Sequence, residues 1–412
     1  MLESALVYNN KKENTYYFKN LDNEAIICLD DPKFIELYQN GKCSELRNNF
    51  LACGFICDEI KSTPLIVILT TYNCNFNCPY CYEHEKKDVS YTDNDIDMIM
   101  NYIEKNYLGV YPKIEINFSG GEPLIAFSNL KKFVTCLNNI FDGLSTQVEY
   151  SLTTNGSLLS NDILNFLNKN KFSIQISLDG NRYLHNKTRS FKNNTPSYDV
   201  ISESIKNIVL NYPRIKLTLR YNIVGIDNVY LSMIDELNSI IDIEYRNKIF
   251  IYFSLIDTKE FIATSDSLEM IEFIQLLYKQ AFDNNYNIPT SYTSGGDCMI
   301  KDNFSICITP GNKVFKCYSL VSYDELSDNM QGYENKPIIH KDKLCYESCA
   351  FKPVCYGGCL YRSYIKDKVF SRNCRKKLLL ELNAFLFFLQ LHKLGVTIEK
   401  DFDVKNITTT FI

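Results

Sequence analysis

Three cysteines in one short loop constrain this sequence more than any other feature. Cys74, Cys78 and Cys81 occur in the run Cys-Asn-Phe-Asn-Cys-Pro-Tyr-Cys, with three residues in the first gap and two in the second. This spacing offers three thiolates to one face of a metal cluster. A cluster of four irons needs four external ligands, so three cysteines leave one iron open to another molecule. The loop therefore predicts a chemically active site rather than a purely structural one.

The cysteine content fits metal binding better than disulfide bonding. The chain has 16 cysteines in 412 residues, but its first residues lack the basic segment and the apolar run of a signal peptide. A chain of this length also does not need disulfides for stability. We therefore expect a reduced, cytoplasmic protein. A net charge of -5 gives no electrostatic footprint for nucleic acid. Charged residues interrupt the apolar stretch 378–394, which predicts an amphipathic helix rather than a membrane span.

From residue 64 the pattern alternates between strand and helix. Six such units with buried strands predict a parallel sheet in an α/β fold, closed in part as a (β/α)6 barrel similar to a TIM barrel. In such folds the chemistry lies at the carboxyl ends of the strands. The predicted strands are 65–69, 113–118, 148–152, 172–178, 216–223 and 249–255. The predicted helices are 94–107, 129–141, 161–168, 199–210, 229–241 and 268–282.

The rest of the chain has a different character. Three short extended runs and two short helices precede residue 60 and predict a small α+β module, with a possible role in binding a peptide or its leader. Past Pro289, Gly, Cys and turn residues replace the helical pattern. We therefore divide the chain into an N-terminal module at 1–63, a barrel core at 64–290, a Cys-rich domain at 291–378, and a C-terminal helix and tail at 379–412.

Polar motifs follow the predicted strands. Ser119-Gly120-Gly121-Glu122-Pro123 follows the second strand, Asn155 follows the third, Ser177-Leu178-Asp179-Gly180 ends the fourth, and Arg220 and Asn222 lie on the fifth. Together with the cysteine loop, these motifs resemble the radical S-adenosylmethionine (SAM) enzymes that carry a C-terminal SPASM domain. The resemblance covers roughly residues 64 to 378. It implies a [4Fe–4S] cluster on the three cysteines, with SAM chelated at the open iron.

The resemblance also implies which residues bind SAM. Tyr80 matches an aromatic near the adenine, and Gly120-Gly121-Glu122 matches the motif that meets the methionine ammonium. Ser177 matches a ribose contact, and Arg189 matches the arginine that binds the carboxylate, for which a guanidinium is well suited. Asp179-Gly180 is interpreted as a turn. Asn155 and Asn222 either line the pocket or cap the edge of the core.

The C-terminal cysteines resemble the SPASM pattern, which implies two auxiliary [4Fe–4S] clusters. The turn at 309–314 resembles the hairpin before one ligand, and Asn312 tolerates the left-handed conformation that this turn requires. Cys307 is either the fourth inner ligand or a core thiol, and in the second case the inner cluster has an open iron. The alternative for the region is a zinc ribbon with four cysteines at each metal. The implied outer ligands are Cys345, Cys349, Cys355 and Cys374, and the implied inner ligands are Cys298, Cys317 and Cys359.

Family chemistry leaves three functional alternatives. Reductive cleavage of SAM gives a 5′-deoxyadenosyl radical that removes a hydrogen atom from the substrate. A maturase of ribosomally made peptides would then form a thioether or C–C crosslink. An anaerobic sulfatase maturase would form formylglycine, but it has an Asp base after the cysteine that matches Cys317, where this chain has Tyr318. The third alternative is a non-catalytic iron–sulfur electron carrier. The expected partners are a short Cys-containing precursor peptide and an external electron donor, with no nucleic acid and no membrane.

Overall fold

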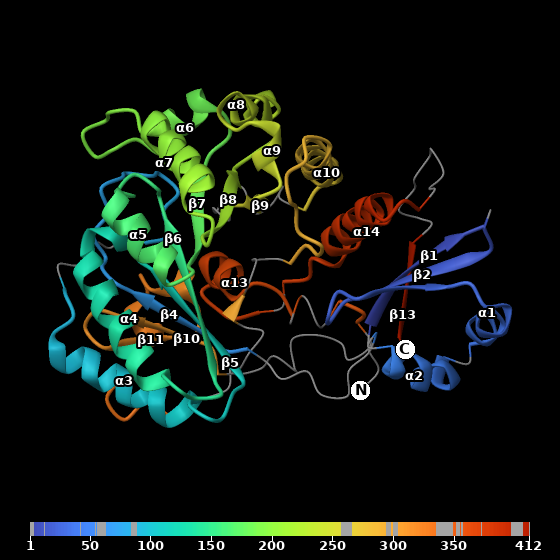
Figure 1. The fold of residues 1–412 in the computed structure, drawn as a ribbon, viewed down its shortest axis with the longest axis horizontal. Helices are drawn as coiled ribbons and strands as arrows, with labels where there is room; N and C mark the ends of the chain where they lie inside the picture. Colours follow the sequence, from blue (N-terminus) through green and yellow to red (C-terminus); the bar gives the residue numbers. More distant parts are fainter. Residues whose placement is uncertain are drawn as a thin grey trace.

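The computed structural model contains two β-sheets, each with its own helices (Figure 1). Among the described residues, the larger sheet has nine strands and the smaller, antiparallel sheet has four. No helix within those residues is long and apolar enough to cross a membrane. The structure describes residues 4–11, 13–41, 43–53, 55, 63–83, 89–256, 266–293, 298–299, 304–334, 349–351, 355, 357–371, 373–396 and 407–411.

Six parallel strands in chain order form the centre of the larger sheet, and each pairs with the next along the chain. Their positions agree with the six predicted strands to within about two residues at each end. They are β4 (Leu65–Leu69), β5 (Lys113–Ser119), β6 (Gln147–Thr154), β7 (Ser173–Leu178), β8 (Lys216–Ile223) and β9 (Ile249–Leu255).

Three later strands extend this sheet beyond β4. β10 (Ile306–Thr309) pairs with β4 in parallel, and β11 (Lys313–Phe315) and β12 (Asp328–Asn329) follow antiparallel. The β10–β11 turn contains Asn312 with φ 59°, as the sequence predicted. β9 and β12 are the edges of the sheet among the described strands, so the barrel is not closed. The mixed α/β fold with a parallel sheet is therefore confirmed as an open sheet.

The two faces of the sheet differ in chemistry. On β7, Ile174 and Ile176 are buried, whereas Ser173, Gln175 and Ser177 alternate with them and are half-exposed. This period of two separates an apolar face from a polar face. The apolar face joins the main hydrophobic core with the helices that cover it. On β4 and β10 the second face carries its own apolar cluster, which includes Val67, Leu69 and Cys307, so the polar surface does not extend over those two strands.

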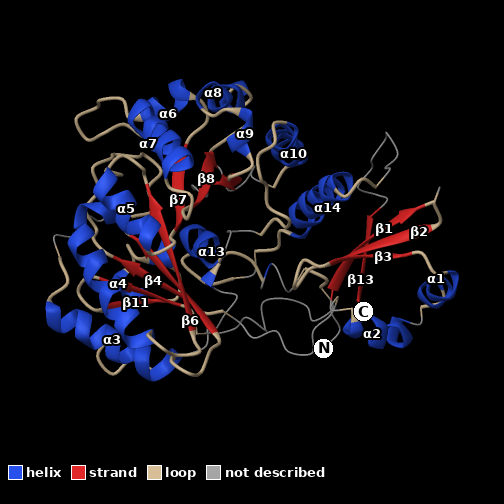
Figure 2. Cartoon of the chain, in the orientation of Figure 1, coloured by secondary structure: helices blue, strands red, loops and turns tan. Residues whose placement is uncertain are grey.

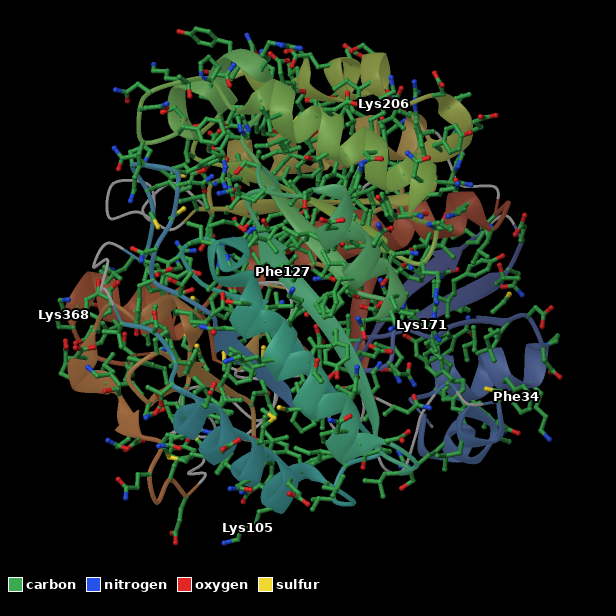
Figure 3. The ribbon with its side chains drawn as sticks, turned by 60° about the vertical axis from the view of Figure 1, so that its left-hand side comes forward. Phe34, Lys105, Phe127, Lys171, Lys206 and Lys368 are labelled. Carbon is green, nitrogen blue, oxygen red and sulfur yellow. The ribbon has the colours of Figure 1, made fainter. Side chains whose placement is uncertain are left out.

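Helices cover the apolar face, and α13 (Leu360–Asp367) lies on the other side of the sheet (Figure 2). Capping side chains fix several helix starts, including a capping box at Thr92 and a Ser267 cap. In Figure 3, Phe127 marks the start of α4, where its ring meets that of Phe166 edge to face at 5.5 Å. The covering helices are α3 (Asp93–Tyr107), α4 (Phe127–Phe141), α5 (Asn161–Lys169), α6 (Arg182–Thr188), α7 (Tyr198–Asn211), α8 (Met233–Ile240), α9 (Ile243–Arg246) and α10 (Leu268–Asp283).

One predicted helix is divided in the structure. The pattern at 229–241 predicts a continuous helix, but a 3₁₀ turn, η2 (Asn228–Tyr230), precedes α8. Asp227 accepts a hydrogen bond from the Val229 backbone N–H and so caps the short turn. Tyr230 is buried, and its hydroxyl accepts a hydrogen bond from the Val224 backbone N–H at 3.2 Å. These two hydrogen bonds stabilise the 3₁₀ turn, and they account for the division of the predicted helix.

The smaller sheet joins the two ends of the chain. It has the order β13-β1-β2-β3, so that the C-terminal strand pairs with the N-terminal one. The sequence analysis did not predict this C-terminal strand. Two short helices accompany the sheet, as the sequence predicted. The elements are β1 (Ser4–Asn10), β2 (Thr15–Asn20), β3 (Ile26–Leu29), β13 (Ile407–Phe411), α1 (Pro32–Gln39) and α2 (Cys43–Ala52).

Helix α14 (Lys376–Lys393) lies between the two sheets (Figure 1). The sequence predicted an amphipathic helix, but buried side chains occur on most of its faces. It packs against α10 on one side. On the other side the buried Lys19 of β2 donates to Gln390 Oε1 at 2.9 Å and to the Thr290 carbonyl. Burial lowers the pKa of Lys19 to about 8. The contact between the sheets therefore contains a buried amine.

Candidate active site

The loop with Cys74, Cys78 and Cys81 follows β4 and is tied to the segment after α6. The Asn77 N–H donates to the Ser190 carbonyl at 3.3 Å, and the Lys192 N–H donates to the Asn75 carbonyl at 2.9 Å. The Phe76 N–H also donates to Cys74 Sγ at 3.4 Å. Hydrogen bonds to ligand sulfurs are one way in which proteins tune iron–sulfur clusters. The loop is therefore held in place by neighbours on the same edge of the sheet.

The two glycines after β5 contact the beginning of the same loop. The Gly121 N–H donates to the Thr71 carbonyl at 2.9 Å, and the Glu122 N–H donates to the Asn73 carbonyl at 2.8 Å. A Cβ on Gly120, whose φ is 144°, would lie 2.3 Å from Thr71 O, and one on Gly121 would lie 2.4 Å from Asn73 O. The missing side chains thus allow a close approach to the protein's own backbone. Contact of these glycines with SAM stays a prediction.

Glu122 is fully buried and accepts hydrogen bonds at both oxygens. Oε1 accepts from Thr154 Oγ1 at 2.7 Å and from the Leu124 N–H at 3.1 Å, and Oε2 accepts from the Asn155 N–H at 2.7 Å. Burial raises the pKa of Glu122, while these three donors act in the opposite direction. Oε2 has one donor among the described residues, and a carboxylate oxygen has room for a second. A ligand ammonium would fit that position.

Tyr80 and Arg189 meet at a buried carboxylate, Asp179. The Tyr80 hydroxyl donates to Asp179 Oδ2, and Arg189 Nη1 donates to the Tyr80 oxygen at 3.0 Å and lies 4.0 Å from Asp179 Oδ1. Thr188 and Asn222 also donate to this carboxylate, at 2.6 and 3.0 Å. Arg189 Nε is buried without a hydrogen-bond partner in the described part of the chain. That donor is free for a carboxylate ligand.

Sequence reasoning missed the role of Asp179, which it interpreted as a turn residue. The structure shows a carboxylate that collects donors from three segments: the cysteine loop, α6 and β8. Asn222 belongs to the group of residues around this carboxylate, and its side-chain nitrogen also lies 3.4 Å from the Tyr80 oxygen. The only signal in the sequence was its position at the end of a predicted strand, next to Arg189 in the family motif. Asp179 therefore links the residues predicted to surround SAM.

A buried histidine supports the backbone of Arg189. The Asp179 N–H points to His185 Nδ1 at 3.4 Å, and His185 Nε2 lies 3.1 Å from Ser197 Oγ, which donates to the Arg189 carbonyl at 2.6 Å. Burial lowers the pKa of His185, and the charge of Arg189 lowers it further. The imidazole is therefore neutral and carries its proton on Nε2. These contacts fix the position of Arg189 after α6.

Two other predicted residues have distinct surroundings. Asn155 donates to Asn75 Oδ1 at 2.8 Å, which ties the end of β6 to the cysteine loop. Ser177 lies half-exposed on the polar face of β7, in register with Arg220 of β8. Its side chain makes no hydrogen bond with another described residue, so its hydroxyl is available to a ligand. Asn155 thus stabilises the loop, and Ser177 faces the open side of the sheet.

The cysteines implied for the inner auxiliary cluster are related through electrostatics. Burial raises the pKa of the Cys317 thiol, and the charges of Cys359 and Cys298 raise it further, so both lie near it. Cys307 is fully buried on β10 among apolar side chains, also within reach of the charge of Cys317. The charges of Cys298 and Cys359 thus act on Cys317, while Cys307 lies in an apolar environment of its own. A shared cluster on Cys298, Cys317 and Cys359 stays a prediction.

The outer set is only partly described. Cys345 lies outside the described residues, Cys349 and Cys355 are half-buried against the main core, and Cys374 is exposed. Among the residues with described positions, no three His, Cys, Asp or Glu side chains converge as a single metal ion requires. The auxiliary clusters and the zinc ribbon both stay predictions.

Comparison with known proteins identifies one domain. The family model described as Radical SAM superfamily matches residues 68–239, a range that contains the cysteine loop, Glu122, Asp179 and Arg189. This match confirms the radical SAM part of the resemblance found in the sequence, and the C-terminal SPASM part lies outside the matched residues. It also identifies the chain as an enzyme, which removes the electron-carrier alternative.

The curated relatives match over part of their length. The radical SAM cyclopropyl synthase TigE of Paramaledivibacter caminithermalis is 28% identical over 172 residues, which is 37% of this chain and 35% of the relative. A cysteine-type anaerobic sulfatase-maturating enzyme of Clostridium novyi is 26% identical over 174 residues, which is 41% of this chain and 45% of the relative. The aligned region thus spans less than half of either relative.

Solved structures resemble more of the chain. Native anSMEcpe with bound AdoMet has a TM-score of 0.62 at 15% identity, covering 81% of this chain and 100% of that one. Streptococcus suis SuiB bound to its precursor peptide SuiA has a TM-score of 0.53 at 13% identity, covering 90% of this chain and 98% of that one. At such low identity the likeness shows a shared fold.

Proposed function

Through its radical SAM domain this chain belongs to the radical SAM enzymes, and we propose that it forms a thioether crosslink in a ribosomally made peptide, with a C–C crosslink as the variant. In this proposal Cys74, Cys78 and Cys81 hold a [4Fe–4S] cluster with SAM at its open iron. When bound, the cluster and SAM supply the radical chemistry that removes a hydrogen atom from a carbon. The residues of the chain bind SAM, orient the peptide and exclude water.

The residues around the cysteine loop fit SAM. Glu122 Oε2 has room to accept from the ammonium, and Arg189 Nε is free to donate to the carboxylate. Tyr80 supplies an aromatic ring beside Arg189, and Ser177 offers a free hydroxyl for the ribose. Glu122 and Arg189 have the charges that the amino-acid end of SAM requires, and Tyr80 and Ser177 have the ring and the hydroxyl that its nucleoside end requires.

Two auxiliary clusters complete the proposal. The charges of Cys298 and Cys359, which act on Cys317, are consistent with an inner cluster on these three residues, and Cys345, Cys349, Cys355 and Cys374 would hold an outer one. Forming a bond after hydrogen abstraction leaves one electron to remove, and these clusters offer it a route. An external donor would supply the electron that starts each turnover. The apolar surroundings of Cys307 favour a core thiol, which leaves one inner iron open.

Tyr318 is the observation that carries the choice of crosslinking. It occupies the position after Cys317 where the sulfatase maturases have an Asp base. Its phenol is buried, and burial raises its pKa to about 12 although the nearby Arg220 lowers it. A group with this pKa holds its proton at neutral pH and does not act as a base there. The position therefore lacks the base that formylglycine formation would use.

The second candidate is an anaerobic sulfatase maturase. The Clostridium novyi relative carries that name, and the full length of anSMEcpe superposes on this chain. For this reaction a group other than Tyr318 would have to accept the proton. The buried Glu83, whose charge acts on Tyr82 and Cys307, is one described carboxylate that could take this role.

Residues 1–63 are proposed to bind part of the peptide substrate. In the small sheet, β3 pairs with β2 on one side and is an edge among the described strands. Ile26, Ile27 and Cys28 of this strand are half-exposed or exposed. An extended peptide adds readily to such an edge through backbone hydrogen bonds.

The test of function compares products. The anaerobically reconstituted enzyme is incubated with SAM, a reductant and either the Cys-containing peptide encoded beside it or a sulfatase peptide with the target Cys. Tandem mass spectrometry should show the first peptide lighter by two hydrogen atoms, with the bridged cysteine resistant to alkylation. An aldehyde in place of the thiol of the sulfatase peptide would support the second candidate. Free thiols in a crosslinked product would favour the C–C variant.

A further inference from the structure

Arg220 lies on the polar face of the sheet, below the residues that fit SAM. It is on β8, two residues before Asn222, which contacts Asp179. The register places Arg220 between Ser177 of β7 and Tyr252 of β9. Because alternate residues of a strand share a face, Arg220 faces the same side as Asn222, one step further from the carboxyl end of the strand. A substrate bound beneath SAM would meet this side chain.

The charge of Arg220 has no carboxylate partner among the described residues. Nη2 donates to Ser254 Oγ at 2.7 Å, while Nε is buried without a hydrogen-bond partner. No described carboxylate forms an ion pair with Arg220. The other buried arginines differ in this respect: Arg189 lies 4.0 Å from Asp179, and Arg362 and Arg375 both pair with Asp266. Taking a charge out of water is costly unless an opposite charge or hydrogen bonds compensate. Arg220 is therefore prepared to bind an anion.

The surroundings of Arg220 connect the two cysteine regions. Tyr82 follows Cys81, Tyr318 follows Cys317, and the two rings meet edge to face with centroids 6.1 Å apart. Arg220 lies near enough to both phenols for its charge to oppose the effect of burial on their pKa values. An anion on Arg220 would lie beside the contact between the SAM region and the inner cysteines.

We propose that Arg220 binds a carboxylate of the peptide substrate, supplied by an Asp or Glu side chain near the residue that is crosslinked. This inference rests on the proposed peptide-modifying function and specifies the class of peptide. A guanidinium presents parallel N–H groups that match both oxygens of a carboxylate, and Nε together with an Nη forms such an edge. The carboxylate of SAM already has a free donor in Arg189 at the ends of the strands. The charge of Arg220 is thus left for the substrate.

The test measures peptide binding apart from catalysis. The reconstituted full-length enzyme, loaded with SAM but without reductant, is exposed to synthetic heptapeptides that contain one central Cys and random residues elsewhere. Bound peptides are sequenced by mass spectrometry. At one fixed sequence position relative to the Cys, peptides retained by the wild-type enzyme should contain Asp or Glu about ten to a hundred times more often than Asn or Gln. This ratio is the one expected for hydrogen bonds between charged groups. Arg220→Gln should lose this preference.

Controls separate charge from folding. Arg214→Gln removes an exposed arginine from the turn before β8 and should leave the preference unchanged. Arg220→Lys keeps the charge without the bidentate edge and should retain a weaker preference. Equal retention of acidic and amide peptides by the wild-type enzyme would overturn the inference, as would retention of none or an unchanged preference in Arg220→Gln. If Arg220→Gln does not fold, the wild-type and Arg220→Lys comparisons still decide. Acidic selection without any crosslinked product would refute the proposed reaction and leave this inference standing.

Discussion

Substitution of the two glycines after β5 should displace the cysteine loop. A Cβ on Gly121 would lie 2.4 Å from Asn73 O and 2.6 Å from Tyr72 O, and both contacts are with backbone. Neither atom can move without moving the segment that leads to Cys74. Overpacking of this kind costs about 1–3 kcal/mol. Gly121→Ala should therefore destabilise the protein by that amount and disturb the cluster site.

Gly120→Ala should be more severe, because it adds backbone strain to a steric overlap. The φ of 144° is one that an alanine rarely adopts, and the new Cβ would lie 2.3 Å from Thr71 O. The unfavourable φ costs about 1–3 kcal/mol, and the overlap adds the cost already given for Gly121. The expected loss of stability is about 2–6 kcal/mol, the sum of these two contributions.

Two other glycines serve as matched controls. Gly143 has a φ of 72° with nothing within 4 Å of its added Cβ, so Gly143→Ala measures backbone strain alone. Gly225 has open space and no positive φ, so Gly225→Ala should change stability by less than about 0.5 kcal/mol. The loss of stability on substitution by alanine should therefore increase from Gly225 through Gly143 to Gly120.

The assay has two readouts. Urea midpoints are compared between variants, because a multidomain metal protein does not unfold in two states and absolute free energies are not defined. Iron content after anaerobic reconstitution tests the site itself. Gly120→Ala and Gly121→Ala should lose about a third of the iron, the share of one cluster among three. A Gly121→Ala variant with the iron and the midpoint of Gly225→Ala would refute the argument.

Three further predictions follow from the same contacts. Arg189→Ala should weaken SAM binding by about 1.5–3 kcal/mol, measured by anaerobic calorimetry, and an unchanged dissociation constant would remove Arg189 from the site. Cys307→Ala should keep the full iron content if Cys307 is a core thiol, whereas a labile inner cluster with an altered paramagnetic resonance spectrum would make it a ligand. The pKa of Lys19 is lowered from 10.5 to about 8, so the folded state binds fewer protons between these values and stability should rise with pH across that window, by at most about 3 kcal/mol. Lys19→Met should remove this rise in urea midpoints measured from pH 7.5 to 10, and an unchanged slope would contradict the assignment.

The sequence predicted the central strands well because their signals are local. The bounds of β4, β8 and β9 coincide with the predicted ranges, since a run of buried residues between turn signals marks a strand without reference to distant partners. Asn312 adopts the left-handed conformation for an equally local reason. Such features depend on a few neighbouring residues.

The strands that the sequence did not place depend on distant partners. β13 pairs with β1 across almost the whole chain, and β10 joins β4 from about 240 residues away. The run Ile-Thr-Thr-Thr-Phe has the β-branched residues of a strand, but nothing in it identifies the partner. The helix at α14 was predicted, but its burial by a second sheet was not, because that sheet is assembled from both chain ends.

The candidate site was predictable to the extent that each residue acts through a short motif. Cys74, Glu122 and Arg189 lie in such motifs, but the position of Arg189 beside Tyr80 involves Asp179, whose carboxylate is surrounded by donors from three segments. In the sequence, Asp-Gly after a strand is typical of a turn, and Gly180 does adopt a positive φ of 54° there. The turn interpretation was thus correct for the backbone and incomplete for the side chain. A motif indicates which groups take part, and the fold decides which buried charge holds them together.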